Sequence, residues 1–192
     1  MAKRVFIVHG WGGSIQEPMH SWMVKELRKR KIEAVAIEMP NSNKPEIIPW
    51  VEHLNRIVGL VNKKTYFIGH SIGCQAILRY LQTLEDEDKV GGCILIAGWF
   101  SLVNLKNDEE VEIAKPWVEG DIKFDKIKKI VNKIIVYLSN DDPYNCVDEN
   151  AKIFREMLGA EVIVEINKGH FTEGDGVTEM PEVLDKILEI SK

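Results

Sequence analysis

The side chains with the clearest chemical potential in this chain are those of Ser71, Asp142 and His170. A serine hydroxyl is too weakly acidic to attack a carbonyl carbon unaided, so it needs a histidine to remove its proton. A carboxylate can hold the imidazole in the required tautomer and stabilise the imidazolium ion that forms. These three residue types therefore predict acyl transfer, with a covalent acyl-enzyme on Ser71.

Ser71 lies in the pentapeptide Gly69-His70-Ser71-Ile72-Gly73, which matches the pattern G-x-S-x-G. The apolar run Tyr66-Phe67-Ile68 precedes it and a helical pattern follows it. This strand–turn–helix context is typical of a nucleophile elbow, in which a tight turn exposes the serine hydroxyl to a cleft. Glycines flank the serine because neighbouring backbone must pass close to the turn.

Two neighbouring carboxylates compete for the acid position, Asp141 and Asp142. Asp142 precedes Pro143, which biases it toward extended backbone, so we favour Asp142 as the acid. Asp141 is expected to be an exposed or turn-stabilising carboxylate. His170 follows a predicted strand and stands beside Gly169, which favours a catalytic histidine over an ordinary exposed loop histidine.

A glycine-rich turn, His9-Gly10-Trp11-Gly12-Gly13, follows the first predicted strand. Such a turn can direct a backbone N–H at the substrate's acyl oxygen, with the N–H of Ile72 as the second donor. Trp11 is our choice for the first donor and Gly12 is the alternative. A dinucleotide site is disfavoured because Ile15 occupies the position of the third glycine, and no Gly-Lys-Ser/Thr follows.

Three aromatic residues, Trp99, Phe100 and Trp117, follow a predicted strand end or lie in an irregular segment. They are candidates for an acyl pocket, with ordinary aromatic packing as the alternative.

The remaining histidines favour structural roles. His9 and His70 flank the two turns and are expected to be hydrogen-bonded supports. His20 and His53 fall within amphipathic helices and show no partner pattern for a metal site. The chemistry therefore predicts no metal and no cofactor.

The elements that must position these residues alternate along the chain. Near-continuous apolar runs predict buried parallel strands at residues 5–8, 34–37, 65–68, 93–97, 134–138 and 162–166. Amphipathic stretches between them predict helices, among them one that starts at a Ser14-x-x-Glu17 capping box and one that ends at Gly159. The pattern predicts an α/β fold, a three-layer α/β/α sandwich with a mostly parallel sheet of about six strands and no large cap domain. We expect one domain over residues 1–192, with a helical excursion over residues 99–129.

Composition excludes several classes of partner. The formal net charge of −5 and a pI near 5.6 argue against nucleic acid. Apolar runs are too short for a signal peptide or for a membrane span of about 20 residues. Three cysteines without C-x-x-C spacing suggest neither disulfides nor zinc, so a cytoplasmic location is expected.

Together these motifs resemble the small serine hydrolases of the retinoblastoma-binding protein 9 and YdeN type, a compact branch of the α/β-hydrolases. The serine–acid–histidine order is also that of α/β-hydrolases. The resemblance covers nearly the whole chain and rests on these motifs: Val8-His9-Gly10-Trp11-Gly12-Gly13-Ser14, Met39-Pro40 with Pro45 and Trp50, Gly69-His70-Ser71-Ile72-Gly73-Cys74, Ser139-Asn140-Asp141-Asp142-Pro143, Gly169-His170-Phe171 and Pro181.

The resemblance implies a lidless hydrolase core with Ser71, Asp142 and His170 as its triad, acting on esters or amides. The L-x-C-x-E segment associated with the retinoblastoma-binding member is absent here, so that partner is not expected. One departure is Asn145-Cys146, where α/β-hydrolases often have Val-Pro, and it affects the expected loop shape. The predicted function is hydrolysis of a small carboxylic ester, amide or thioester; the alternative is a partner-binding protein on a hydrolase fold.

Overall fold

The computed structural model describes residues 2–192 and contains one six-stranded sheet in which every strand pair is parallel. Its strand order is β2-β1-β3-β4-β5-β6. The strands are β1 (Arg4–Val8), β2 (Glu33–Ile37), β3 (Thr65–His70), β4 (Gly92–Ile96), β5 (Ile134–Ser139) and β6 (Glu161–Glu165). The predicted six-stranded parallel sheet is therefore confirmed.

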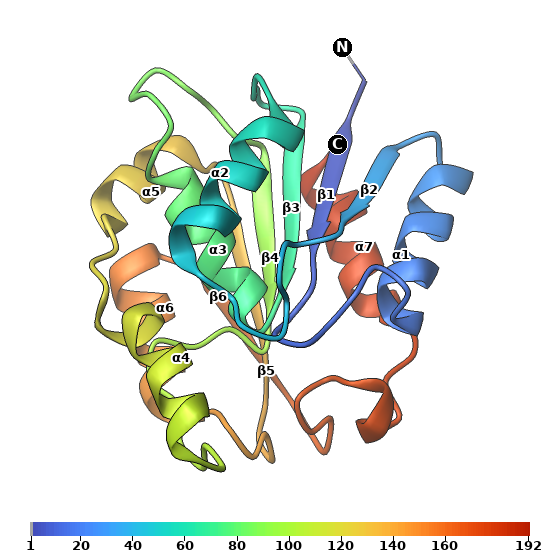
Figure 1. The fold of residues 1–192 in the computed structure, drawn as a ribbon. Coiled ribbons are helices and arrows are strands. Elements are labelled where there is room, and N and C mark those ends of the chain that lie inside the picture. The colour runs from blue at the N-terminus through green and yellow to red at the C-terminus, as the bar shows by residue number, and fades with distance from the viewer. Residues whose placement is uncertain (1) are drawn as a thin grey trace.

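Helices cover both faces of the sheet and complete the predicted three layers (Figure 1). The first and last helices pack on one face, whereas the second, third, fifth and sixth pack on the other. The helices are α1 (Pro18–Lys29), α2 (Ile47–Val58), α3 (Ile72–Leu81), α4 (Asp108–Glu119), α5 (Phe124–Ile130), α6 (Val147–Leu158) and α7 (Pro181–Ile190).

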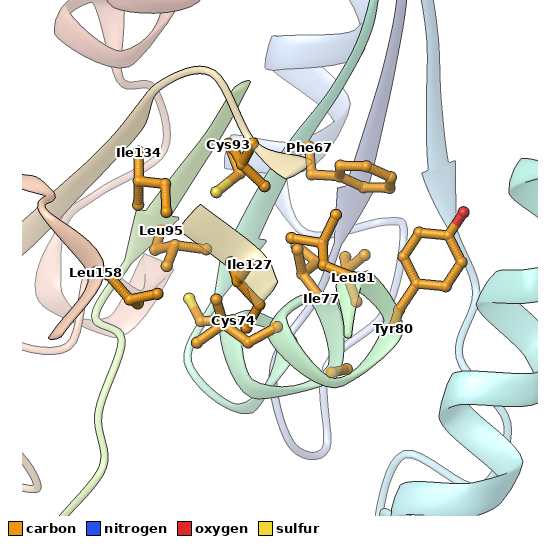
Figure 2. Close-up of a cluster of buried hydrophobic side chains, with 14 of the residues drawn as sticks. Phe67, Cys74, Ile77, Tyr80, Leu81, Cys93, Leu95, Ile127, Ile134 and Leu158 are labelled. Atoms are coloured by element: carbon orange, nitrogen blue, oxygen red, sulfur yellow. The ribbon is translucent and has the colours of Figure 1, made fainter. Parts of the chain in front are cut away.

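The central strands are buried along their whole length, which explains why their sequences are continuously apolar. On the α3 face, Phe67 and Leu95 of the sheet pack against the inward-facing side of α3 (Figure 2). Cys74 lies in this layer one turn behind Ser71, and Ile77 lies almost one turn further along α3. The turn that carries Ser71 is thus anchored to the largest part of the core.

Two helix ends show how local residues set the boundaries. Helix α6 ends at Gly159, which adopts the left-handed conformation with φ 63° and ψ 27°, as predicted. The predicted start of α1 at Ser14 is wrong, because the helix begins at Pro18. A residue that precedes proline is disfavoured in helical backbone, so Glu17 has an extended ψ of 135° and the helix cannot begin before Pro18. Of the predicted capping box, the bond from the Ser14 N–H to the Glu17 carboxylate is present, at 3.0 Å.

The excursion over residues 99–129 contains α4, which lies near the carboxyl end of the sheet, and part of α5, which lies toward the amino end (Figure 1). The buried guanidinium of Arg79 on α3 holds it by donating to the carbonyls of Trp117, at 2.8 Å, and Gly120, at 3.1 Å. Burial lowers the pKa of Arg79 to about 10. Within residues 2–192, no helix combines the length and hydrophobicity needed to cross a lipid bilayer.

Candidate active site

Ser71, His170 and Asp142 form one hydrogen-bonded chain at the carboxyl edge of the sheet. Ser71 lies between the end of β3 and the start of α3, Asp142 follows β5 and His170 follows β6. His170 Nδ1–H donates to Asp142 Oδ2 at 2.8 Å, which leaves Nε2 free to accept the Ser71 hydroxyl at 2.8 Å. This is the arrangement required for a histidine that removes the serine proton.

Ser71 is held in a strained backbone conformation, with φ 54° and ψ −124°. Such a conformation in a non-glycine residue persists only where the surroundings enforce it. A Cβ at Gly73 would lie 2.5 Å from the Val8 carbonyl oxygen, and one at Gly69 would lie 2.9 Å from the Cys74 nitrogen. The two glycines of the G-x-S-x-G pattern are therefore required by close backbone contacts.

Every polar group of His170 is engaged. Besides the two ring bonds, its backbone N–H donates to Asp175 Oδ2 at 3.0 Å, and its carbonyl accepts His70 Nε2–H at 2.8 Å. Asp175 also accepts the N–H of Thr172 at 3.0 Å, so it organises the whole turn. The loop that carries His170 is thus fixed by His70 at the end of β3 and by Asp175 within the loop itself.

The two candidate aspartates have different environments. The Asp142 side chain is fully buried, and its second oxygen accepts the Tyr144 N–H at 3.0 Å. Asp141 is exposed and accepts the Ser139 hydroxyl at 2.6 Å and the Gly169 N–H at 2.9 Å. The hydroxyl of Ser139, followed by the Gly169 N–H, lowers the pKa of Asp141. Asp142 thus contacts the histidine ring, whereas Asp141 tethers the backbone beside it.

The two predicted oxyanion donors come from the start of α3 and from the glycine-rich turn after β1. Ile72 is the first residue of α3, where an N–H has no partner within the helix. Gly12 donates its N–H to the Ser42 carbonyl at 2.7 Å, whereas no hydrogen bond within residues 2–192 uses the Trp11 N–H. The Trp11 indole donates to the Asn43 carbonyl at 2.9 Å, which fixes this residue. Trp11 is therefore a better donor candidate than Gly12.

A cavity of about 450 Å³ opens beside Ser71. We call the following lining residues, which lie at or after strand ends or in the glycine-rich turn, the catalytic floor: Gly10, Trp11, His70, Ser71, Trp99 and His170. We call the lining residues from the other connecting segments and α4 the rim: Leu102, Leu105, Glu110, Tyr144, Thr172, Glu173 and Gly174. Gly12, Gly13 and Glu17 complete the lining on the side of α1.

Of the three aromatic candidates, the structure brings only Trp99 to the cavity. Phe100 points away from it, with its ring centroid 4.7 Å from that of Phe154. Trp117 is buried against Trp50, with centroids 5.8 Å apart, and its indole donates to the Pro45 carbonyl. The structure corrects the pocket prediction for Phe100 and Trp117, since both serve core packing.

Two buried asparagines that the sequence did not single out as site residues hold the segment after β4, which carries Trp99. Asn145 donates to the Gly98 carbonyl at 2.9 Å, and Asn150 donates to Asn145 Oδ1 at 2.7 Å. Asn150 Oδ1 in turn accepts the N–H groups of Phe100 and Ser101. Both asparagines are buried, so this network fixes the segment after β4. The available signal was the replacement of the usual Val-Pro by Asn145-Cys146.

The two buried thiols, Cys74 one turn behind Ser71 and Cys93 near the start of β4, are not activated. Burial raises the pKa of Cys74 well above its usual value and that of Cys93 to about 12. Cys74 Sγ lies 3.3 Å from the Ile96 carbonyl as a weak donor. All three cysteines are free thiols in the described chain. The nucleophile candidate at this edge is therefore the serine.

A parallel sheet of this kind, with a strained serine after a central strand and its partners on later strand ends, defines the class of α/β-hydrolases. The sequence model of the family described as serine hydrolase matches residues 5–189, so the chain belongs to the serine hydrolase family.

Relatives support this membership over most of the chain. YdeN of Bacillus subtilis (strain 168) is 29% identical over 188 residues, which are 96% of this chain and 94% of YdeN. The serine hydrolase RBBP9 of Rattus norvegicus is 27% identical over 165 residues, covering 85% of this chain and 78% of that protein. The predicted resemblance to this family is confirmed.

Solved structures agree with the fold. The crystal structure of the ydeN gene product has a TM-score of 0.89 and 28% identity, with 98% of each chain covered. Est1E from Butyrivibrio proteoclasticus has a TM-score of 0.73 at 13% identity, with 98% of this chain and 88% of that chain covered. The second similarity concerns the fold alone.

Proposed function

We propose that this protein hydrolyses small carboxylic esters, or related amides or thioesters, through an acyl-enzyme on Ser71. The observation that carries the proposal is the hydrogen-bonded chain from Ser71 through His170 to Asp142, next to an open cavity. A partner-binding protein without activity would need neither this series of hydrogen bonds nor the strained Ser71 backbone.

In the proposed reaction, Ser71 Oγ attacks the carbonyl carbon while His170 Nε2 takes its proton. The N–H groups of Trp11 and Ile72 stabilise the oxyanion. His170 then returns the proton to the leaving group, and a water molecule activated by His170 releases the acid. Asp142 keeps Nδ1 protonated and stabilises the imidazolium formed in each step. These reaction steps need no metal or cofactor.

The cavity supports a small acyl substrate. Its volume is within the range of about 300–1,000 Å³ that is usual for small-molecule sites. Apolar side chains of Trp99, Leu102 and Leu105 line it. We infer carboxylesterase activity, with peptidase and thioesterase activity as variants of the same chemistry.

The test is turnover of short and long nitrophenyl esters, a thioester and an aminoacyl amide. We expect the short esters to be hydrolysed, with Ser71→Ala and His170→Ala each lowering kcat by roughly a thousandfold or more. Ser101→Ala is the matched control and should retain activity, because Ser101 does not line the cavity. Equal activity in wild type and Ser71→Ala would contradict the proposal.

A further inference from the structure

Two buried histidines beside Ser71 each have a ring nitrogen without a partner. His20 is 2% exposed and His70 is 5% exposed, and their ring centroids are 6.1 Å apart. His20 Nε2 and His70 Nδ1 make no hydrogen bond with any residue from 2 to 192. A buried polar atom left unpaired costs free energy and calls for an ion or a water as its partner.

Glu17 completes a set of three ligands. One nitrogen of each imidazole and one oxygen of Glu17 all lie within 4.8 Å of one another. Two imidazoles and one carboxylate form a common ligand set for Zn²⁺, and two ligand atoms on a tetrahedral zinc lie roughly 3.4 Å apart. Side-chain movements on the order of 1 Å would therefore close the site around an ion.

The opposite ring nitrogens have the partners expected of metal ligands. A histidine that binds a metal usually donates its other N–H to a carbonyl or a carboxylate. His70 Nε2–H donates to the His170 carbonyl at 2.8 Å. His20 Nδ1 lies 3.4 Å from the Ser14 carbonyl oxygen and 3.3 Å from Glu17 Oε2, so Glu17 already contacts His20 without an ion. His9 differs, because its Nδ1–H donates to the Gly10 carbonyl and its Nε2 accepts the Met39 N–H.

Burial favours neutral rings at this site, and the site is accessible from the cavity. Burial lowers the pKa of His70 to about 3 and also lowers the pKa of His20. Metal ligands must be deprotonated in this way. Glu17 and His70 line the active-site cavity, which gives an ion a path of entry.

We propose that Glu17, His20 and His70 form a binding site for Zn²⁺, and that zinc bound there inhibits the enzyme. The ring of His70 lies 5.3 Å from that of His170, centroid to centroid. An ion held by Glu17 and His70 would occupy the cavity beside Ser71, and a shift of the His70 ring toward it would disturb the bond from His70 Nε2–H to the His170 carbonyl. The binding site stands on its own geometry, whereas the inhibition rests on the proposed function.

Binding is tested first, on tag-free protein, by titrating Zn²⁺ in competition with a chromophoric chelator. We expect one zinc per wild-type chain, with His20→Gln and Glu17→Gln each weakening affinity by at least about tenfold. His53→Gln, a half-buried histidine of α2 outside the cluster, is the matched control and should bind as wild type does. Circular dichroism checks that each variant is folded. Zinc binding that is absent, or equal in wild type and both cluster variants, overturns the site.

Inhibition is tested by ester turnover and by fluorophosphonate labelling, each with Zn²⁺ and with EDTA. We expect saturating zinc to lower both by at least about tenfold in wild type, and EDTA to restore them. His20→Gln should match wild type in EDTA and resist zinc. Stoichiometric zinc binding with unchanged labelling would overturn the inhibition, whereas absence of turnover and labelling even in EDTA would overturn the proposed function and leave the binding result intact.

Discussion

The catalytic floor and the rim of the cavity are built differently. The floor residue Ser71 is 8% exposed, sits between backbone contacts that exclude any side chain at Gly73, and shares a fixed hydrogen-bond chain with His170. The rim comes from connecting segments and the first turn of α4, and Leu102 and Leu105 are half-buried there. Under the proposed function, this difference separates the reacting groups, held at strand ends, from the residues that would contact the substrate, which are held by loops.

The largest expected effect separates the two neighbouring carboxylates beside His170, Asp142 and Asp141. Asp142→Asn should lower kcat by roughly a thousandfold to ten-thousandfold, because His170 would lose the acceptor that fixes its tautomer. Asp141→Asn should lower kcat by only about fivefold, since it weakens a backbone tether. Steady-state kinetics on a nitrophenyl ester measure both, and a larger loss at Asp141 would reverse the assignment.

The next effect concerns the packing beneath the floor. Gly73→Ala should lower the free energy of unfolding by about 2–3 kcal/mol, because its Cβ would collide with the carbonyls of Val8 and His9. Gly174→Ala on the rim is the matched control, since its Cβ would meet only Thr172 Oγ1 at 3.5 Å. Urea denaturation measures both. Equal free energies of unfolding for Gly73→Ala and Gly174→Ala would contradict tight packing at Gly73.

A smaller effect is expected from the rim itself. Leu105→Ala should raise KM for an apolar ester roughly threefold to tenfold and leave kcat nearly unchanged, since it removes binding area and no reacting group. Val103→Ala is the control, because Val103 is exposed and does not line the cavity. A fall in kcat equal to that of a floor variant would break the division between floor and rim.

The smallest effect is expected at the thiols. Because burial raises the pKa of Cys74, iodoacetamide at neutral pH should leave Cys74 unmodified in the native protein. Activity should then remain within about twofold of the untreated level. Peptide mass spectrometry gives the modified sites. Activity loss that follows Cys74 alkylation would contradict this prediction and indicate that the Cys74 thiol is accessible.

The sheet and the Ser71 turn could be predicted because their signals are local. Continuous apolar runs mark buried strands, and a strand–G-x-S-x-G–helix pattern sets the conformation of one short turn. Pro143 separated Asp142 from Asp141 through a backbone preference that acts on the neighbouring residue alone.

The remaining features depend on contacts between distant segments. Trp117 is a core residue because α4 folds back onto α2, which no local pattern of residues 99–129 indicates. His20 and His70 are fifty positions apart and meet only because α1 packs beside the end of β3. Glu17 lies three residues before His20 and contacts it at 3.3 Å, but this local pair could not predict that His70 joins the cluster.

The central claim is that Ser71 is the nucleophile, and the most direct measurement is labelling with a fluorophosphonate probe followed by peptide mass spectrometry. We expect one covalent adduct on Ser71 in wild type, full labelling of Ser101→Ala, and no labelling of Ser71→Ala. Equal labelling of wild type and Ser71→Ala, or absence of labelling in folded, metal-free wild type, would contradict it.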